Sequence, residues 1–129
     1  MVDNITPPLP AGRQLIQGYG GGGFRIAGSE YPHSVFVTET VTTRWEIADL
    51  MQMSLPPELG AGSGIAVLLI GTGKSIVQIP RDIRPTLRTA GIGVEIMDTG
   101  AACRTFNVLL SEERAVAALL IAVDDDPVA

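Results

Sequence analysis

The sequence predicts an α/β fold, a three-layer sandwich with a mixed, largely parallel central sheet and two main helices. Strand-like and helix-like segments alternate in the second half, which requires crossover connections between parallel strands. The run 65–70 is apolar throughout, as expected for a strand covered on both faces. The first half has the pattern of β structure, so we expect it to add a β-rich N-terminal layer.

The chain divides into three predicted parts. Residues 1–12 carry three prolines within four positions, which disfavours helix and sheet, so we expect a flexible arm. Residues 13–123 are expected to form a single α/β domain, large enough at this length to bury a core. Residues 124–129 are expected to form a solvated acidic tail.

In the first half, strand-like pieces at 14–17 and 24–27 flank a glycine-rich turn. The longest β signal follows and runs from 34 to 47. Its alternation predicts one face formed by Val35, Val37, Val41 and Trp45.

In the second half, the helices are predicted from spacing and from their ends. A short helix is expected at 80–90, with a proline early and Gly91 ending it. A longer helix is expected at 99–112, with Asp98 or Thr99 as its N-cap. Strands are expected at 92–97 and 114–123.

Composition excludes several classes of protein. The net charge is −5 and the nine Lys and Arg residues are scattered, which argues against nucleic-acid binding. Cys103 and His33 are the only cysteine and histidine, so no metal site is expected. The longest apolar stretch, 115–123, is too short to cross a bilayer. We therefore expect a cytoplasmic protein without membrane insertion.

Two motifs imitate nucleotide-binding loops. The stretch LLIGTGKS at 68–75 lacks the first glycine of a P-loop, and the β-branched run after it ends at Pro80. Gly18, Gly20 and Gly23 fit the dinucleotide pattern, but they lead into a strand instead of opening a helix. Both are interpreted as turns, and no cofactor is expected.

A candidate ligand site lies where two predicted parallel strands end. The loops 71–73 and 98–101 would face one crevice, into which the second helix points its free N–H groups. Thr72, Asp98 and Thr99 would lie at the crevice and Arg104 on its helix, while Arg25 and Lys74 could approach from elsewhere. A small anion would fit this arrangement. The alternative is structural, with Asp98 capping the helix and Arg104 paired to a neighbouring carboxylate.

Cys103 lies in the first turns of the second helix, where a thiolate would be favoured. The sole imidazole, His33, lies in a turn seventy residues away. A buried, unreactive thiol is therefore the favoured interpretation.

Several segments resemble one family: GYGGGGFRIAG, VLLIGTG and GIGVEIMDTGAACRTFN, in that order. This family is a domain of unknown function that includes mitochondrial complex I assembly factor three, the adipogenesis-associated domain-containing protein and many uncharacterised bacterial proteins. The resemblance covers about 17–123 and implies a three-layer α/β sandwich. It implies no catalytic residues. The motif positions whose roles it leaves open are Phe24, Arg25, Gly71, Thr72, Gly73, Asp98, Thr99, Cys103, Arg104 and Asn107.

Two functional hypotheses remain. The resemblance favours a non-enzymatic protein-interaction module that assists assembly of a respiratory NADH:ubiquinone oxidoreductase, with a complex subunit or another assembly factor as partner. The alternative is a small-anion or metabolite-binding protein, or an enzyme, using the crevice between Gly71–Gly73 and Asp98–Arg104. A homodimer is compatible with either hypothesis.

Overall fold

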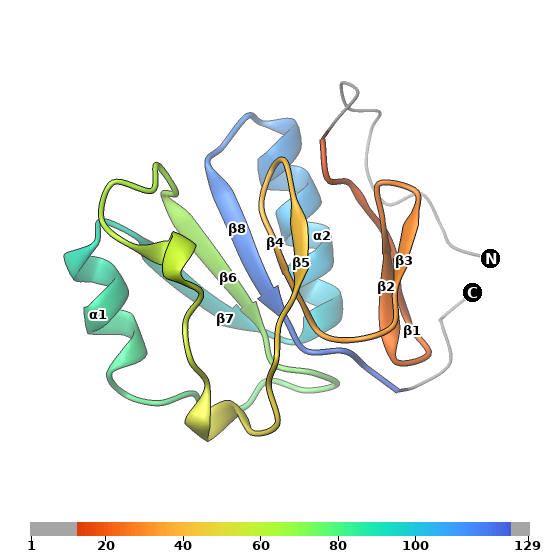
Figure 1. Cartoon of the computed structure of the whole chain (residues 1–129), viewed down its shortest axis with the longest axis horizontal. Coiled ribbons are helices and arrows are strands. Elements are labelled where there is room, and N and C mark those ends of the chain that lie inside the picture. Colours follow the sequence, from red (N-terminus) through yellow and green to blue (C-terminus); the bar gives the residue numbers. More distant parts are fainter. Residues whose placement is uncertain (1–12, 125–129) are drawn as a thin grey trace.

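A five-stranded mixed sheet forms the centre of the fold (Figure 1). β6 (Val67–Gly71) pairs in parallel with both β7 (Gly93–Met97) and β8 (Val116–Leu120). On the far side of β8, β4 (Val35–Val37) and then β5 (Thr42–Arg44) add antiparallel strands, so the order is β5-β4-β8-β6-β7. The predicted mixed central sheet is confirmed, and its parallel part consists of β8, β6 and β7.

The computed structural model describes residues 13–124. The expected arm, 1–12, and residues 125–129 of the expected acidic tail lie outside this range. The division into arm, domain and tail stays a prediction.

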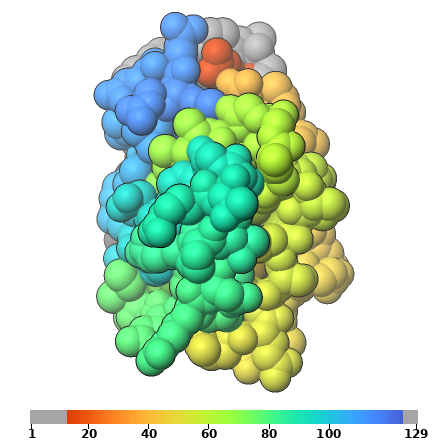
Figure 2. Space-filling view, turned by 90° about the vertical axis from the view of Figure 1, so that its left-hand side faces the viewer, coloured from red at the N-terminus to blue at the C-terminus, as the bar shows by residue number. Residues whose placement is uncertain are grey.

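Each face of the sheet carries one helix. α1 (Ile83–Thr89) covers one face together with two short 3₁₀ helices, η1 (Leu50–Gln52) and η2 (Pro57–Leu59). Figure 2 shows α1 in teal facing the viewer, with the yellow to lime segment between β5 and β6 beside it. α2 (Thr99–Ser111) covers the opposite face and is close to its predicted bounds.

α1 begins three residues later than the predicted start at position 80. Pro85 explains the difference, because proline lacks the N–H that every helical residue beyond the first turn must donate. A helix starting at Ile83 places Pro85 in that first turn. Gly91 follows the helix with a φ of +83°, so the predicted glycine stop is confirmed.

A three-stranded antiparallel sheet packs on the outer side of α2 (Figure 1). It consists of β1 (Ile16–Gly20), β2 (Gly23–Ile26) and β3 (Ser29–Tyr31). Gly21 and Gly22 connect the first two strands with φ values of +62° and +83°, as a two-residue type I′ turn requires. The glycine run is thus a hairpin turn leading into a strand, as predicted, and it provides the expected β-rich layer.

The residues of β6 alternate between two apolar cores. Leu69 points to the α2 side, where it packs in one cluster with Phe106. Leu68 and Ile70 point to the α1 side and pack in a second cluster with Leu87. This alternation of wholly buried residues confirms that the apolar run 65–70 contains a strand covered on both faces.

The prediction of one long strand over 34–47 is wrong. The segment folds back as the β4–β5 hairpin, because Thr38 N–H donates to the carbonyl of Val41 (2.8 Å) and the Thr38 hydroxyl accepts from Val41 N–H (3.2 Å). The turn reverses the chain and interrupts the alternation. Val41 is therefore exposed, and Trp45 packs in the α1-side cluster, opposite the core that holds Val35.

Asn107 joins α2 to the outer sheet. Its side-chain oxygen accepts from the N–H of Ile16 (2.9 Å), and its side-chain nitrogen donates to the carbonyl of Ile16 (2.7 Å). The side chain is fully buried. Through these two hydrogen bonds it takes the place that a neighbouring strand would have beside Ile16 of β1. This gives a structural role to a motif position whose role the sequence left open.

Replacing Asn107 by alanine is expected to lower the free energy of unfolding by about 2–3 kcal/mol, since both backbone groups of Ile16 lose their partner in a buried site. Urea denaturation measures this loss. Hydrogen exchange should accelerate most strongly in β1 and β2. Val108→Ala on the exposed side of α2 is the matched control and should change stability by less than about 1 kcal/mol. Equal effects of the two substitutions would contradict this role for Asn107.

Candidate functional site

The ends of β6, β7 and β8 are tied together by the hydroxyl of Thr99. This hydroxyl accepts from Gly73 N–H (2.9 Å) and donates to the carbonyl of Ile121 (2.8 Å). Thr99 N–H in turn donates to the carbonyl of Gly73 (2.8 Å). Thr99 is fully buried, and a buried polar group needs a hydrogen-bond partner. Its partners are backbone groups at the strand ends, so these contacts hold the strand ends together.

Gly71 allows α2 to approach the sheet closely. A Cβ at this position would lie 2.9 Å from the Cα of Thr99 and 3.1 Å from the Cβ of Ala102. Real Cβ atoms do not reach such a distance to a backbone atom, so a larger residue would push the helix away. The predicted crevice between 71–73 and the start of α2 is packed by the protein's own atoms at this point.

Asp98 is the N-cap of α2, as expected in the structural alternative. Its carboxylate accepts from the N–H of Ala101 (2.9 Å), which satisfies one of the free donors of the first turn. A carboxylate here also lies favourably at the positive end of the helix dipole.

Thr72 shapes the loop that follows β6. Its hydroxyl donates to the carbonyl of Ser75 (2.8 Å) and accepts from Val77 N–H (3.2 Å). The same hydroxyl lies 3.3 Å from the carbonyl of Met97 at the end of β7. A single side chain thus fixes the path of the loop and ties it to the neighbouring strand.

This loop displays two apolar side chains. Ile76 is 63% exposed and Val77 is 44% exposed, in a molecule whose other isoleucines and valines are mostly buried. The sequence interpretation used 75–79 only as evidence against a helix. The signal in the sequence is the pair of β-branched residues shortly after Gly73, in a segment bounded by a glycine turn and Pro80.

The predicted site residues are only partly brought together. Thr72, Asp98 and Thr99 meet at the strand ends, and Lys74 is exposed in the loop beside them. Arg104 is exposed on α2, and its guanidinium and the Tyr19 hydroxyl both approach the place that a Cβ would take on Gly100. Among the described residues Arg104 forms no ion pair, in contrast to the pairing expected in the structural alternative.

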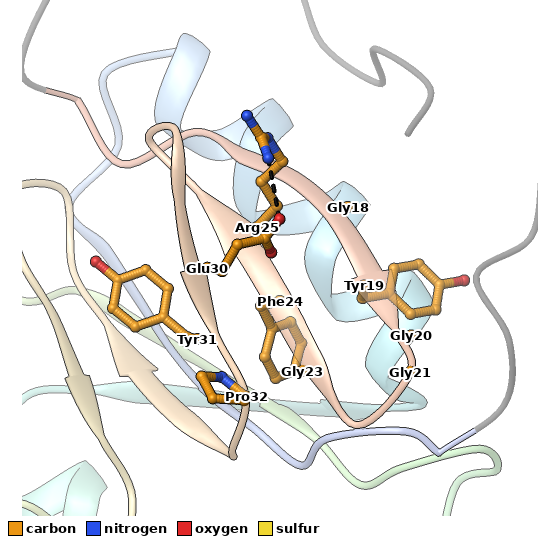
Figure 3. A pocket seen from close by; sticks show the side chains of 10 residues that line it. All are labelled: Gly18, Tyr19, Gly20, Gly21, Gly23, Phe24, Arg25, Glu30, Tyr31 and Pro32. Atoms are coloured by element: carbon orange, nitrogen blue, oxygen red, sulfur yellow. Dashed lines mark hydrogen bonds and ion pairs between the residues drawn. The ribbon is translucent and has the colours of Figure 1, made fainter. Parts of the chain in front are cut away.

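Arg25 lies in the outer sheet and points away from the strand ends. It forms an ion pair with Glu30 (2.9 Å) across β2 and β3, drawn as the dashed line in Figure 3. The two residues border a hollow of about 210 Å³, whose other lining side chains include Phe24, Tyr19 and Tyr31 (Figure 3). Small-molecule pockets usually enclose about 300–1,000 Å³, so this hollow is small for a metabolite.

Cys103 is fully buried against the core on the α2 side. Burial raises the pKa of its thiol strongly, because the thiolate would lose its hydration. Arg104 opposes this rise and Asp98 adds to it, but both are smaller effects. The thiol is therefore neutral at physiological pH, in line with the interpretation as an unreactive group.

Two general features concern the described residues as a whole. No cluster of three or more His, Cys, Asp or Glu side chains within 13–124 has the arrangement of a metal site. The longest helix in this range, α2, has thirteen residues, and no helix there has both the length and the apolar character needed to cross a bilayer.

The fold and the strand-end motif define a class of small mixed α/β domains, and the comparisons identify the family. A family profile described as Protein of unknown function (DUF498/DUF598) matches residues 16–121. The chain belongs to this family, which confirms the resemblance.

Solved structures share this fold. A crystal structure of an outer membrane protein from Bartonella henselae is 40% identical, with a TM-score of 0.80, over 87% of this chain and 97% of that one. A solution structure of a Mth938-like domain from Bordetella pertussis is 26% identical, with a TM-score of 0.69, over 93% of this chain and 92% of that one.

Relatives with a named role include a vertebrate assembly factor. The Xenopus tropicalis NADH dehydrogenase (ubiquinone) 1 alpha subcomplex assembly factor 3 is 33% identical over 110 residues, which cover 83% of this chain. The matched region spans 60% of the length of that relative.

Replacing Gly71 by alanine is expected to lower the free energy of unfolding by about 1–3 kcal/mol, because the added methyl group has to displace the backbone of α2. Chemical denaturation measures this loss. Gly60→Ala is the matched control, because its Cβ would lie 3.5 Å from the nearest carbonyl and meet no close contact. If Gly71→Ala is as stable as the control, the close approach of α2 is not a constraint.

The stability of the folded protein is expected to fall as the pH rises above about 8.5. The raised pKa means that folded Cys103 keeps its proton where the unfolded thiol loses it, so the unfolded state gains by ionising. The slope from this group approaches about 1.4 kcal/mol per pH unit. Denaturation of the protein and of Cys103→Ala between pH 7 and 10 measures it. Identical pH profiles would contradict a buried, protonated thiol.

Proposed function

We propose that the chain is a non-enzymatic protein-interaction module that assists assembly of a respiratory NADH:ubiquinone oxidoreductase. Two lines of evidence support this. The first is the 33% identity over most of the chain to a complex I assembly factor from Xenopus tropicalis. The second, which carries the proposal, is the ordered loop after β6 that exposes Ile76 and Val77.

The loop has the properties of an interaction site. Complete burial of an isoleucine or valine side chain contributes about 1.5–3 kcal/mol, so leaving two of them in water forgoes a large stabilisation. Thr72 holds the loop in one conformation through its bonds to Ser75 and Val77, which reduces the entropy lost when a partner binds. A rigid apolar projection of this kind fits a hydrophobic recess on a partner protein.

The proposed partner is a subunit of the respiratory complex or another assembly factor. The proposed location is the cytoplasmic face of the membrane that contains the complex. Contact through the loop after β6 lets the domain reach that membrane through its partner without inserting into it.

A ligand site at the strand ends would need polar atoms to be available there. The hydroxyls of Thr72 and Thr99 are each used by two or more backbone groups, and the Asp98 carboxylate caps α2. These contacts favour the interaction module over a small-anion or metabolite site at this position.

Ile76→Ser is expected to remove the interaction and leave the fold intact, because the side chain is already largely exposed. The tagged chain is expressed in its native cells, and the respiratory subunits that it captures are quantified by mass spectrometry. Capture should fall at least tenfold for Ile76→Ser. Val41→Ser in the β4–β5 turn is the matched control, because Val41 is 49% exposed.

Deletion of the gene gives a second readout for the same proposal. Assembled NADH:ubiquinone oxidoreductase, measured on native gels, should decrease and should be restored by the chain but not by Ile76→Ser. Recovery of the chain alone, together with normal levels of the complex in the deletion strain, would show that the proposed function is wrong.

A further inference from the structure

β7 forms one edge of the central sheet, and its outer backbone groups have no strand beside them among the described residues. Gly93 N–H donates to the carbonyl of Ala66 (2.9 Å), and the Met97 carbonyl accepts from Thr72 N–H (2.9 Å), so these positions face β6. Along a parallel strand, successive residues direct their N–H and C=O groups to opposite sides, so Glu95 also faces β6 while its two neighbours face outward. Val94 and Ile96 therefore present the open edge.

Three arginines line this open edge. Arg84 and Arg88 are four residues apart on α1 and therefore lie on the same side of this helix. Arg81 lies in the turn just before the helix. All three are exposed, and together they are one third of the nine basic residues of a chain with net charge −5. A third of the basic residues thus lies beside one strand of a molecule whose net charge is negative.

The arginines border two hollows that follow β7. One, of about 480 Å³, is lined by Arg84, Arg88, Val94 and the acidic Glu95 among others. The other, of about 330 Å³, is lined by Arg81, Arg84 and Ile96 among others. Arg84 borders both, so the two hollows follow one another along the strand, and the five residues of β7 span roughly 16 Å.

Arg84 also binds the edge itself. Its guanidinium donates to the carbonyl of Val94 (2.8 Å), one of the outward backbone groups. A charged side chain in this position protects an open strand from unwanted pairing. The same contact is replaceable, because an incoming strand can supply its own N–H to Val94 and its own carboxylate to Arg84.

We propose that the β7 edge binds an extended acidic peptide segment of a partner protein as an additional strand. Backbone bonds form with Val94 and Ile96, and acidic side chains on alternate positions meet Arg81, Arg84 and Arg88. Val94 and Ile96 point to the α1 side, whereas Glu95 points to the other face. The partner segment is therefore acidic at every second position. The positions between are not acidic, because a carboxylate there would lie on the same face as Glu95 and be repelled by it.

The proposal rests on the interaction role proposed above and assigns it a second surface of different chemistry. The loop that contains Ile76 would contact an apolar recess, whereas the β7 edge would contact an acidic strand. The two proposals are tested separately. The β7 edge is tested with purified protein and a synthetic peptide, whereas the loop is tested by capture of respiratory subunits from cells.

The probe is a fluorescent peptide of alternating Glu and Thr residues, and its binding to the full chain is measured by anisotropy. Binding should weaken as salt is added, and the amide NMR signals of Val94 and Ile96 should shift most strongly. Arg88→Gln should weaken binding by roughly threefold to tenfold, and the pair Arg84→Gln and Arg88→Gln by more. Arg44→Gln on β5 at the opposite edge is the matched control and should leave binding unchanged.

Further peptides separate pairing from simple charge attraction. The same residues arranged as a Glu block and a Thr block, or alternating peptides that contain proline or replace Glu with Lys, should bind at least tenfold more weakly. Equal binding of the block or proline peptide would overturn the proposal in favour of attraction alone. The proposal would also be overturned if the chain without peptide sediments as a dimer and the amides of Val94 and Ile96 are already protected from hydrogen exchange. That result would indicate that a second copy of the chain occupies this edge. Ile76→Ser should leave peptide binding unchanged.

Discussion

The structure depends on how α2 satisfies its polar groups while it is buried between two sheets. Thr99 bonds to backbone groups of Gly73 and Ile121, and Asn107 bonds to both backbone groups of Ile16. An unpaired polar group in such a site would cost about 1–3 kcal/mol, so each side chain has to find a partner. In doing so, one end of α2 fixes the strand ends and its middle fixes the outer sheet.

This arrangement leaves the strand-end region closed and the loop beyond it ordered. Gly71 brings α2 against β6, Thr99 closes the space between the strand ends, and Thr72 guides the chain through the following turn. The motif positions at the strand ends, which resemble a ligand site in the sequence, therefore have structural roles here. Beyond these strand ends, the loop after β6 exposes the apolar side chains of Ile76 and Val77, on which the proposed interaction role rests.

The two edges of the central sheet are treated differently. The β5 edge belongs to a short hairpin that carries the surface pair Arg44–Glu46 (2.8 Å), a common way to protect an edge strand. The β7 edge is bordered by three arginines, and the one acidic residue in its two hollows is Glu95 of β7 itself. Protection of this edge and the proposed recognition of a peptide are compatible. The positive charge of the arginines would repel a second copy of the same edge and would attract an acidic strand.

The sequence by itself determined the order of strands and helices, the cap and length of α2 and the glycine hairpin, because these features depend on contacts within a few residues along the chain. The pairing of the strands is a long-range contact, since Val67 of β6 lies beside Val116 of β8. The break at Thr38 was missed because the turn is made by hydrogen bonds between Thr38 and Val41 and is not marked by a glycine or proline in the sequence. The contacts of Asn107 and the position of the arginines beside β7 were decided by the tertiary structure alone. Asn107 meets Ile16 across 91 positions of sequence, and an open edge exists only once the order of the strands is set.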